Sequence, residues 1–215
     1  MITQLIVGVI LLGSAGFVSA QQTILNVPTT DVLDKGKVYF ELDASFKTND
    51  QDALQKFSSF VPRVVVGVGK NVEVGLNVTG NIQPGNDTTT LVPTVKWKFY
   101  ENEKKNIALM AGTNVYIPIR DRAYNFGTYS YLAISTTINK TRLTAGGYVA
   151  SKNVLATDAV RSGGQFGFEQ ALNSKVTLAA DSITGRHSNG YLTPGIIYKP
   201  HRNVTTLLGI FNWQR

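Results

Sequence analysis

Apolar residues alternate with polar or small residues along most of this chain. Residues 70–81 read KNVEVGLNVTGN, in which the apolar positions are Val72, Val74, Leu76 and Val78, and the positions between them hold Glu73, Gly75, Asn77 and Thr79. Successive side chains of a β-strand point to opposite faces of its sheet. The pattern therefore predicts a strand with one apolar face and one polar face.

The same two-residue period returns in ten further segments. They are residues 38–46, 61–69, 90–100, 107–117, 126–138, 143–150, 165–169, 176–181, 192–199 and 204–213, the last with a blurred pattern. Most of these segments approach the ~9–11 residues with which a tilted strand crosses a bilayer. We therefore predict an all-β, antiparallel, up-and-down transmembrane β-barrel.

The connections between these segments alternate in length. Short turns are expected at 69–71, 101–106, 139–141, 173–174 and 200–203, and longer links at 47–60, 82–89, 118–125, 151–164 and 185–190. Transmembrane barrels have short periplasmic turns and longer outer loops. A soluble sandwich has no reason to sort its loops in this way, so the alternation favours a barrel.

The polar face of the predicted strands is rich in small hydrogen-bonding residues, with single charges. A soluble sheet more often exposes many Lys and Glu residues, which prevent edge pairing. We predict that this face lines a lumen. The predicted lumen-lining residues are Tyr39, Glu41, Asp43, Arg63, Lys96, Lys98, Tyr116, Tyr129, Tyr131, Tyr148, Glu169, Asp181 and Lys199.

Composition agrees with strands rather than helices, with 43% hydrophobic and 16% charged residues, 20 Gly, 9 Tyr and 10 Phe. The chain has no Cys, so a large core or closure of a sheet has to replace disulfides. The net charge of +7 is not concentrated in clusters of basic and aromatic residues, and we predict no nucleic-acid partner.

The N-terminal residues 1–20 have the features of a secretory signal peptide. An apolar run covers 5–12, and Val18-Ser19-Ala20 forms the small-x-small pattern before a cleavage site. The alternatives are a short membrane anchor or a core segment, although the run is shorter than the ~20 residues of a spanning helix. We expect residues 21–35 to form a periplasmic lead-in and residues 36–215 the barrel.

Together these features resemble bacterial outer-membrane β-barrel proteins of the small porin-like or transporter type. The resemblance rests on the signal peptide, on NVPTTDVLDKGK (26–37) leading into VYFELDASF (38–46), and on the alternating loop lengths. It implies a Gram-negative outer membrane, the passage of small solutes, and an even number of strands. It also implies two girdles of aromatic residues, for which the candidates include Phe40, Phe46, Phe60, Trp97, Phe99, Phe126, Phe166 and Tyr198.

Eleven segments are one short of an even count. We expect about twelve strands, with the last one missing from this sequence, which ends in NWQR rather than in an aromatic residue. Two alternatives stay open. Residues 23–33 supply the partner strand, or the count is wrong by one.

Catalytic chemistry finds little support. The chain has two histidines and no Gly-rich phosphate loop, and we predict no catalytic residue, cofactor or metal site. In GRHSNG (185–190), His187 and Ser188 are adjacent, whereas barrel lipid A deacylases separate these residue types by one position. Adjacent side chains of an extended backbone point apart. We interpret the string as a polar outer loop.

Three hypotheses follow. The first is a monomeric outer-membrane barrel with a narrow, polar, tyrosine-lined channel that passes or binds small solutes and has membrane lipid as its other partner. The second is a structural or adhesive barrel with a closed lumen that acts through its outer loops. The third is a soluble secreted β-sandwich.

Overall fold

The computed structural model describes residues 3–9, 22–47, 57–80, 89–120, 126–154, 159–185 and 190–213. Its strands are β1 (Thr3–Val9), β2 (Val38–Lys47), β3 (Phe57–Gly69), β4 (Val72–Thr79), β5 (Thr90–Asn102), β6 (Ile107–Pro118), β7 (Gly127–Ile138), β8 (Thr141–Ala150), β9 (Ser162–Ala171), β10 (Val176–Ile183), β11 (Tyr191–His201) and β12 (Val204–Trp213). A single 3-10 turn, η1 (Glu103–Lys105), joins β5 to β6. Within these described ranges, no helix is long and apolar enough to cross a membrane.

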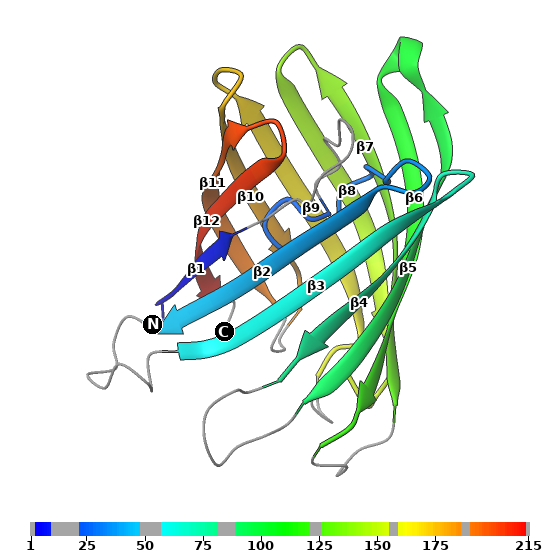
Figure 1. The fold of residues 1–215 in the computed structure, drawn as a ribbon, viewed down its shortest axis with the longest axis vertical. Coiled ribbons are helices and arrows are strands. Elements are labelled where there is room, and N and C mark those ends of the chain that lie inside the picture. Colours follow the sequence, from blue (N-terminus) through cyan, green and yellow to red (C-terminus); the bar gives the residue numbers. More distant parts are fainter. Residues whose placement is uncertain are drawn as a thin grey trace.

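The eleven strands from β2 to β12 form one sheet in which each strand pairs antiparallel with the next. The predicted all-β, antiparallel fold is thereby confirmed. The sheet is strongly curled around an interior (Figure 1). Alternate side chains of every strand therefore point either into this interior or away from it.

The short turns β3–β4, β5–β6, β7–β8, β9–β10 and β11–β12 all lie at the same end of the strands (Figure 1). The β3–β4 turn places Lys70 and Asn71 at φ 54° and 58°. Two successive residues with positive φ characterise the type I′ hairpin, whose twist matches that of its strands. Asn106 and Asn139 also have positive φ, at 52° and 56°, in turns at the same end. Asparagine tolerates this conformation better than most residues, which explains why the turns can be so short.

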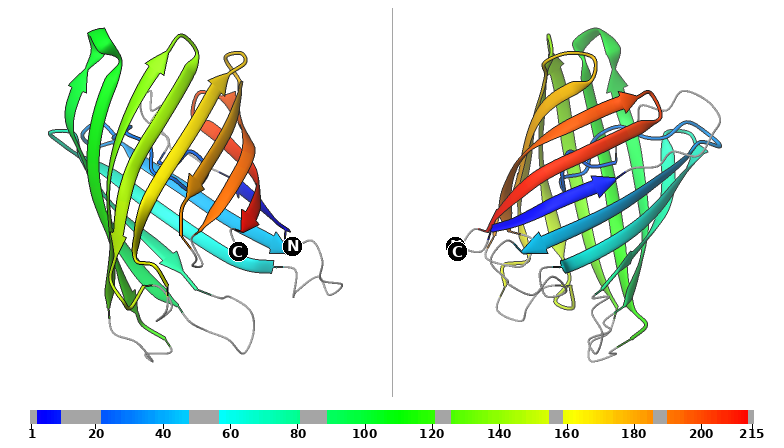
Figure 2. Two further views of the ribbon diagram at one scale, coloured as in Figure 1. Left: turned by 180° about the vertical axis from the view of Figure 1, so that it is seen from behind. Right: turned by 60° about the vertical axis from the view of Figure 1, so that its left-hand side comes forward.

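The two edges of this sheet, β2 and β12, run in the same direction, and no pairing between them occurs in the described part of the chain. In the structure, β1 lies between them and pairs antiparallel with both (Figure 2). β1 falls within the predicted signal peptide, whose cleavage site after Ala20 lies outside the described residues. The sheet of residues 21–215 is thus not closed by its own strands.

The alternative in which residues 23–33 supply a partner strand is wrong. Their backbone makes one isolated bridge, between Thr23 and Pro28, and joins no strand of the sheet. Instead, the segment Gln22–Lys37, called here the N-terminal segment, lies inside the curled sheet (Figure 2). Ile24, Val27 and Leu33 are almost fully buried there.

Apolar and polar residues occupy opposite faces of the sheet. On the outer face Val74, Leu76 and Leu132 are 42%, 38% and 53% exposed. On the inner face Glu73 is only 2% exposed. We call the face that carries Glu73, Lys96, Arg142 and Asp181 the interior face. The buried cluster consists of interior-face residues together with apolar residues of the N-terminal segment.

Glycines on the interior face make room for the N-terminal segment. A Cβ added to Gly67 on β3 would lie 2.1 Å from the carbonyl oxygen of Asp34. The two backbones are also joined by hydrogen bonds here. The Gly36 N–H donates to the Gly67 oxygen, and the Gly67 N–H donates to the Lys37 oxygen. The small residues of the polar face therefore allow close approach of a second backbone.

We predict that Gly67→Ala lowers the free energy of unfolding by about 1–3 kcal/mol, because the added methyl group overlaps backbone that has nowhere to move. Gly147→Ala on the outer face is the matched control, since its nearest atom would be 3.5 Å away. That variant should stay within about 0.5 kcal/mol of the wild type. Denaturant unfolding of both variants measures the difference, and equal effects would contradict the close approach.

Candidate functional site

The candidate site is the interior face with the N-terminal segment bound to it. The segment crosses the interior and makes polar contacts with three separate parts of the surrounding strands, whose interior face is called here the wall. These involve Asp181 on β10, the Glu73–Lys96 pair on β4 and β5, and Arg142 on β8. The contacts decide both the shape of the interior and which of its charges are available to a solute.

Asp181 binds a turn of the segment through the backbone. Its Oδ2 accepts hydrogen bonds from the N–H groups of Leu25 (3.0 Å), Asn26 and Val27 (2.7 Å). The Asn26 side chain donates in addition to the Thr193 hydroxyl, 3.2 Å away on β11. Three N–H groups compensate a buried carboxylate without a cation, because hydrogen bonds to a charged acceptor are about twice as strong as neutral ones.

Glu73 and Lys96 form a buried ion pair that also holds the segment. Lys96 Nζ lies 2.9 Å from Glu73 Oε1, and both side chains are at most 5% exposed. Glu73 Oε2 accepts from the Leu33 N–H at 2.9 Å and from Gln22 Nε2 at 3.1 Å. Gln22 Oε1 in turn accepts from Lys96 Nζ. The Glu73–Lys96 ion pair thus binds the N-terminal segment at two places, Gln22 and Leu33.

Arg142 makes the third contact. Its Nη1 and Nη2 donate to the two carboxylate oxygens of Asp31 at 2.8 and 3.1 Å, a bidentate geometry, and Nη2 also donates to the Thr30 hydroxyl. The Thr30 hydroxyl also contacts the Ser135 hydroxyl on β7. Arg142 Nε lies 3.7 Å from Glu169 on β9, so the arginine has a second carboxylate within the wall.

A fourth charge cluster belongs to the wall alone. Arg63 on β3 pairs with Glu41 at 2.9 Å and with Asp43 at 3.5 Å, and its Nε donates to Asn77 Oδ1 at 3.1 Å. All four residues lie on neighbouring strands of the interior face, and these contacts do not involve the N-terminal segment. This cluster therefore does not depend on the segment.

Tyrosines fill another part of the interior. The rings of Tyr129 and Tyr148 are stacked with centroids 5.1 Å apart, and Tyr131 lies 6.1 Å from Tyr129. The Tyr148 hydroxyl donates to the Thr184 carbonyl oxygen. Gly112 lies beneath the ring of Tyr131, because a Cβ there would come within 2.4 Å of it. Glycines thus accommodate aromatic rings as well as the segment.

The structure brings many of the sequence-predicted residues into this site. Glu41, Asp43, Arg63, Lys96, Glu169 and Asp181 take part in the contacts above, and Tyr129, Tyr131 and Tyr148 form the aromatic cluster. Tyr39 is buried and Tyr116 packs against the same buried cluster. Lys98 instead pairs with Glu101 beside the β5–β6 turn, and Lys199 is half-buried near the β11–β12 turn.

Several residues of the site were missing from the predicted set. Glu73 is not one of them, because its parity in the stretch 70–81 predicts that it lines the interior together with Asn77 and Thr79. Arg142 has the same parity but looks like a basic turn residue, because it follows Lys140 closely. Gln22 and Asp31 carry no signal in the sequence, since a segment without periodicity gives no indication of what it packs against.

Some interior polar atoms have no partner among the described residues. Within this part of the chain Gln165 is fully buried, yet neither its Oε1 nor its Nε2 makes a hydrogen bond, and the same holds for the Tyr129 hydroxyl and the Thr144 hydroxyl. Buried polar groups are costly when they are left unsatisfied. These atoms are therefore available for water or for a polar solute.

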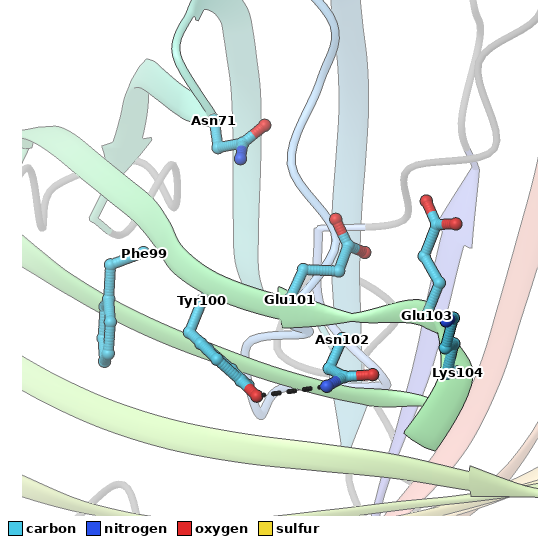
Figure 3. A pocket seen from close by; sticks show the side chains of 7 residues that line it. All are labelled: Asn71, Phe99, Tyr100, Glu101, Asn102, Glu103 and Lys104. Carbon is cyan, nitrogen blue, oxygen red and sulfur yellow. Dashed lines mark hydrogen bonds between the residues drawn. The ribbon is translucent and has the colours of Figure 1, made fainter.

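Two hollows lie at the end of the strands that carries the short turns. One of about 540 Å³ is lined by Asn71 and by residues 99–104, with the Tyr100 hydroxyl 3.4 Å from Asn102 Nδ2 (Figure 3). The other, of about 240 Å³, lies where Thr30, Asp31 and Arg142 meet the ends of β5, β6 and β7. The second hollow adjoins the Arg142 contact and is thus part of the site.

Among the described residues, no cluster of His, Asp or Glu has the arrangement of a metal site. His201 accepts a hydrogen bond from the Asn203 N–H in the β11–β12 turn. His187 and Ser188 lie outside the described residues. No family model and no curated protein matches the chain.

We predict that Asp181→Asn lowers the free energy of unfolding by about 1–3 kcal/mol, because the charged acceptor of three N–H groups is replaced by a neutral one. Asp34→Asn is the matched control, since Asp34 is exposed in the same segment. Hydrogen exchange should accelerate at Leu25, Asn26 and Val27 in the first variant alone. Unchanged exchange at these amides would contradict the Asp181 contact.

We further predict that Lys96→Met costs about 3–5 kcal/mol of stability, because it leaves Glu73 buried without its cation. Adding Glu73→Gln to this variant should restore part of the loss, since the unpaired charge is then gone. A double-mutant cycle in denaturant measures the coupling. Additive effects of the two substitutions would show that the pair is not coupled.

Proposed function

We propose that this protein is a closed, transmembrane β-barrel of the bacterial outer membrane, with a narrow polar channel for the binding or passage of small solutes. The observation that carries the proposal is the distribution of side chains, with large apolar residues exposed on the outer face and ionised residues buried inside. A soluble sandwich buries its apolar face instead. A lipid environment reverses this order, as it does for porins.

The outer face supports a membrane location in two ways. Its exposed residues include Leu132, Ile134, Leu178, Ile196 and Leu208, which lie on strands around the sheet. Trp97 and Phe99, 5.5 Å apart, are exposed near the short-turn end of β5, where a membrane protein places its aromatic girdle.

Closure follows from the cost of unpaired backbone in lipid. An open edge cannot lie in the hydrocarbon region, because each unsatisfied N–H or C=O there costs several kcal/mol. Since β2 and β12 run in the same direction, an antiparallel barrel needs one more strand between them. β1 takes this position in the structure. We therefore propose twelve strands for the barrel in the membrane, with an antiparallel strand at this seam.

The interior supports solute binding through its polarity. The Arg63–Glu41 and Lys96–Glu73 pairs keep the wall close to neutral, and the free atoms of Gln165 and Tyr129 offer hydrogen bonds. The second candidate, a barrel with a closed lumen, is favoured by the N-terminal segment, which occupies part of the interior. The two differ in whether the purified protein conducts.

The test is fractionation followed by recording in planar bilayers. The channel proposal expects the protein in the outer-membrane fraction, a heat-dependent shift in gel mobility, and ion conductance after reconstitution. Release of the protein into buffer after osmotic shock would end the membrane proposal. Membrane insertion without any conductance would leave the closed-lumen candidate.

We predict that Leu132→Arg impairs membrane insertion, because an arginine on the lipid face near the bilayer centre costs about 2–4 kcal/mol. Leu172→Arg is the matched control, since Leu172 is also exposed but lies in the β9–β10 turn. The folded fraction in vesicles, measured by the gel-mobility shift, should fall for the first variant only. Equal folding of both variants would place Leu132 outside the lipid region.

A further inference from the structure

We propose that the interior face is a peptide-binding site, occupied by the chain's own N-terminal segment, and that this segment is a releasable plug which closes the channel. The inference rests on the proposed channel. It adds a ligand class, an extended peptide with free N–H groups and an acidic side chain, and a gating role that the channel proposal does not contain.

The first argument is the kind of contact that holds the segment. Asp181 accepts hydrogen bonds from the backbone of one turn of the segment. Glu73 accepts from one backbone N–H, and Arg142 donates to one carboxylate. These are discrete polar contacts at three points of the wall. Water can replace each of them when the segment leaves, whereas a strand in the sheet would lose a whole ladder of hydrogen bonds.

The second argument is that the wall keeps most of its charges paired without the segment. Lys96 remains bound to Glu73, and Arg63 to Glu41 and Asp43, all within the wall. Arg142 loses Asp31 but has Glu169 nearby, with 3.7 Å between Arg142 Nε and Glu169 Oε2. Breaking a buried pair is costly because one charge is left uncompensated. Release of the segment avoids this cost except at Asp181, whose three N–H donors belong to the segment and have to be replaced by water.

The third argument is the shape of the wall. Gly67 and Gly167 lie where the segment is closest, and a Cβ at Gly167 would come within 2.0 Å of Ile24 Cδ1. Gly36, at φ 79°, lies at the end of the segment, two residues before β2, and gives the chain a turn that few other residues adopt. The interior face thus has a fitted binding surface, and the segment stays attached through this turn when it moves.

The apolar side chains of the segment oppose release. Ile24, Val27 and Leu33 are buried against the interior, so the plugged state is the dominant one. Weakening the polar contacts should therefore increase a small open population without unfolding the barrel. The gate is closed at rest and opens when a competing ligand or a change in the contacts displaces the segment.

The test uses the full-length chain with a cysteine pair, which is simple because the protein contains no Cys. Thr30→Cys with Ser135→Cys joins the segment to β7, where the two native hydroxyls are in contact. The matched control is Thr113→Cys with Ser130→Cys, whose native hydroxyls lie 2.9 Å apart on the adjacent strands β6 and β7. Both pairs are recorded in planar bilayers under oxidising and reducing conditions.

We expect the oxidised Thr30–Ser135 pair to abolish openings and the reductant to restore them, while the Thr113–Ser130 pair shows no such dependence. Asp181→Asn combined with Arg142→Gln should raise the open fraction by at least about tenfold, because each substitution weakens one of the polar contacts that hold the segment. Asp34→Asn should leave it unchanged. A synthetic peptide of residues 22–34 should close the channels opened by Asp31→Asn, because this substitution weakens the segment and leaves Asp181 and Arg142 of the wall unchanged.

The outcomes separate the plug from the channel. Equal conductance of the oxidised and reduced Thr30–Ser135 pair would overturn the plug and leave the channel proposal intact. Silence of every variant in both conditions, with the protein inserted, would overturn the channel and the gate together. Openings in Asp31→Asn that the peptide does not close would overturn the peptide-binding site.

Discussion

The neutralisation of charge inside the curled sheet is the constraint on which the rest of the structure depends. Glu73, Lys96, Arg142 and Asp181 lie on a face that water reaches poorly, and an isolated charge in such a place is very costly. Each charge is compensated in a different way: Glu73 by Lys96, Arg142 by Asp31 and Glu169, and Asp181 by three N–H groups. These requirements determine where the N-terminal segment lies, since it supplies Asp31 and the three N–H groups.

The same constraint explains the many glycines and tyrosines of the polar face. A backbone that donates to Asp181 and to Glu73 has to approach the wall closely, and Gly67 allows this where any side chain would overlap Asp34. Between the contacts, the large ring of Tyr131 fills the interior, and it has room because Gly112 lies beneath it. The glycines of the wall therefore have a packing role, because they leave room for the segment backbone and for the ring of Tyr131.

Periodicity in the sequence predicts the strands and their faces well, because a half-buried strand repeats every two residues. The prediction extends to the turn at Lys70 and Asn71 and to the antiparallel order of all eleven strands from β2 to β12. It is weaker for bounds, since β3 begins at Phe57 and β9 at Ser162, where the alternation has no clear start. The position of β1 could not be predicted from the sequence. Residues 5–9, Leu-Ile-Val-Gly-Val, do not alternate between apolar and polar side chains, and they belong to a stretch with the features of an export signal.

Only the part of the site that lies on the strands can be predicted from the sequence, whereas the part contributed by the N-terminal segment cannot. Parity identifies Glu41, Arg63, Lys96 and Asp181 as inward-facing, but it cannot say which charge lacks a partner in the wall. Asp181 is the informative case, because it forms no ion pair within the described part of the chain and its partners are N–H groups 154 to 156 residues away. A single carboxylate on a wall whose other charges are paired is therefore a sign that something else binds there. In this protein the bound group is a part of the chain that has no periodicity, so the wall's own charge balance is the best indication of where the segment lies.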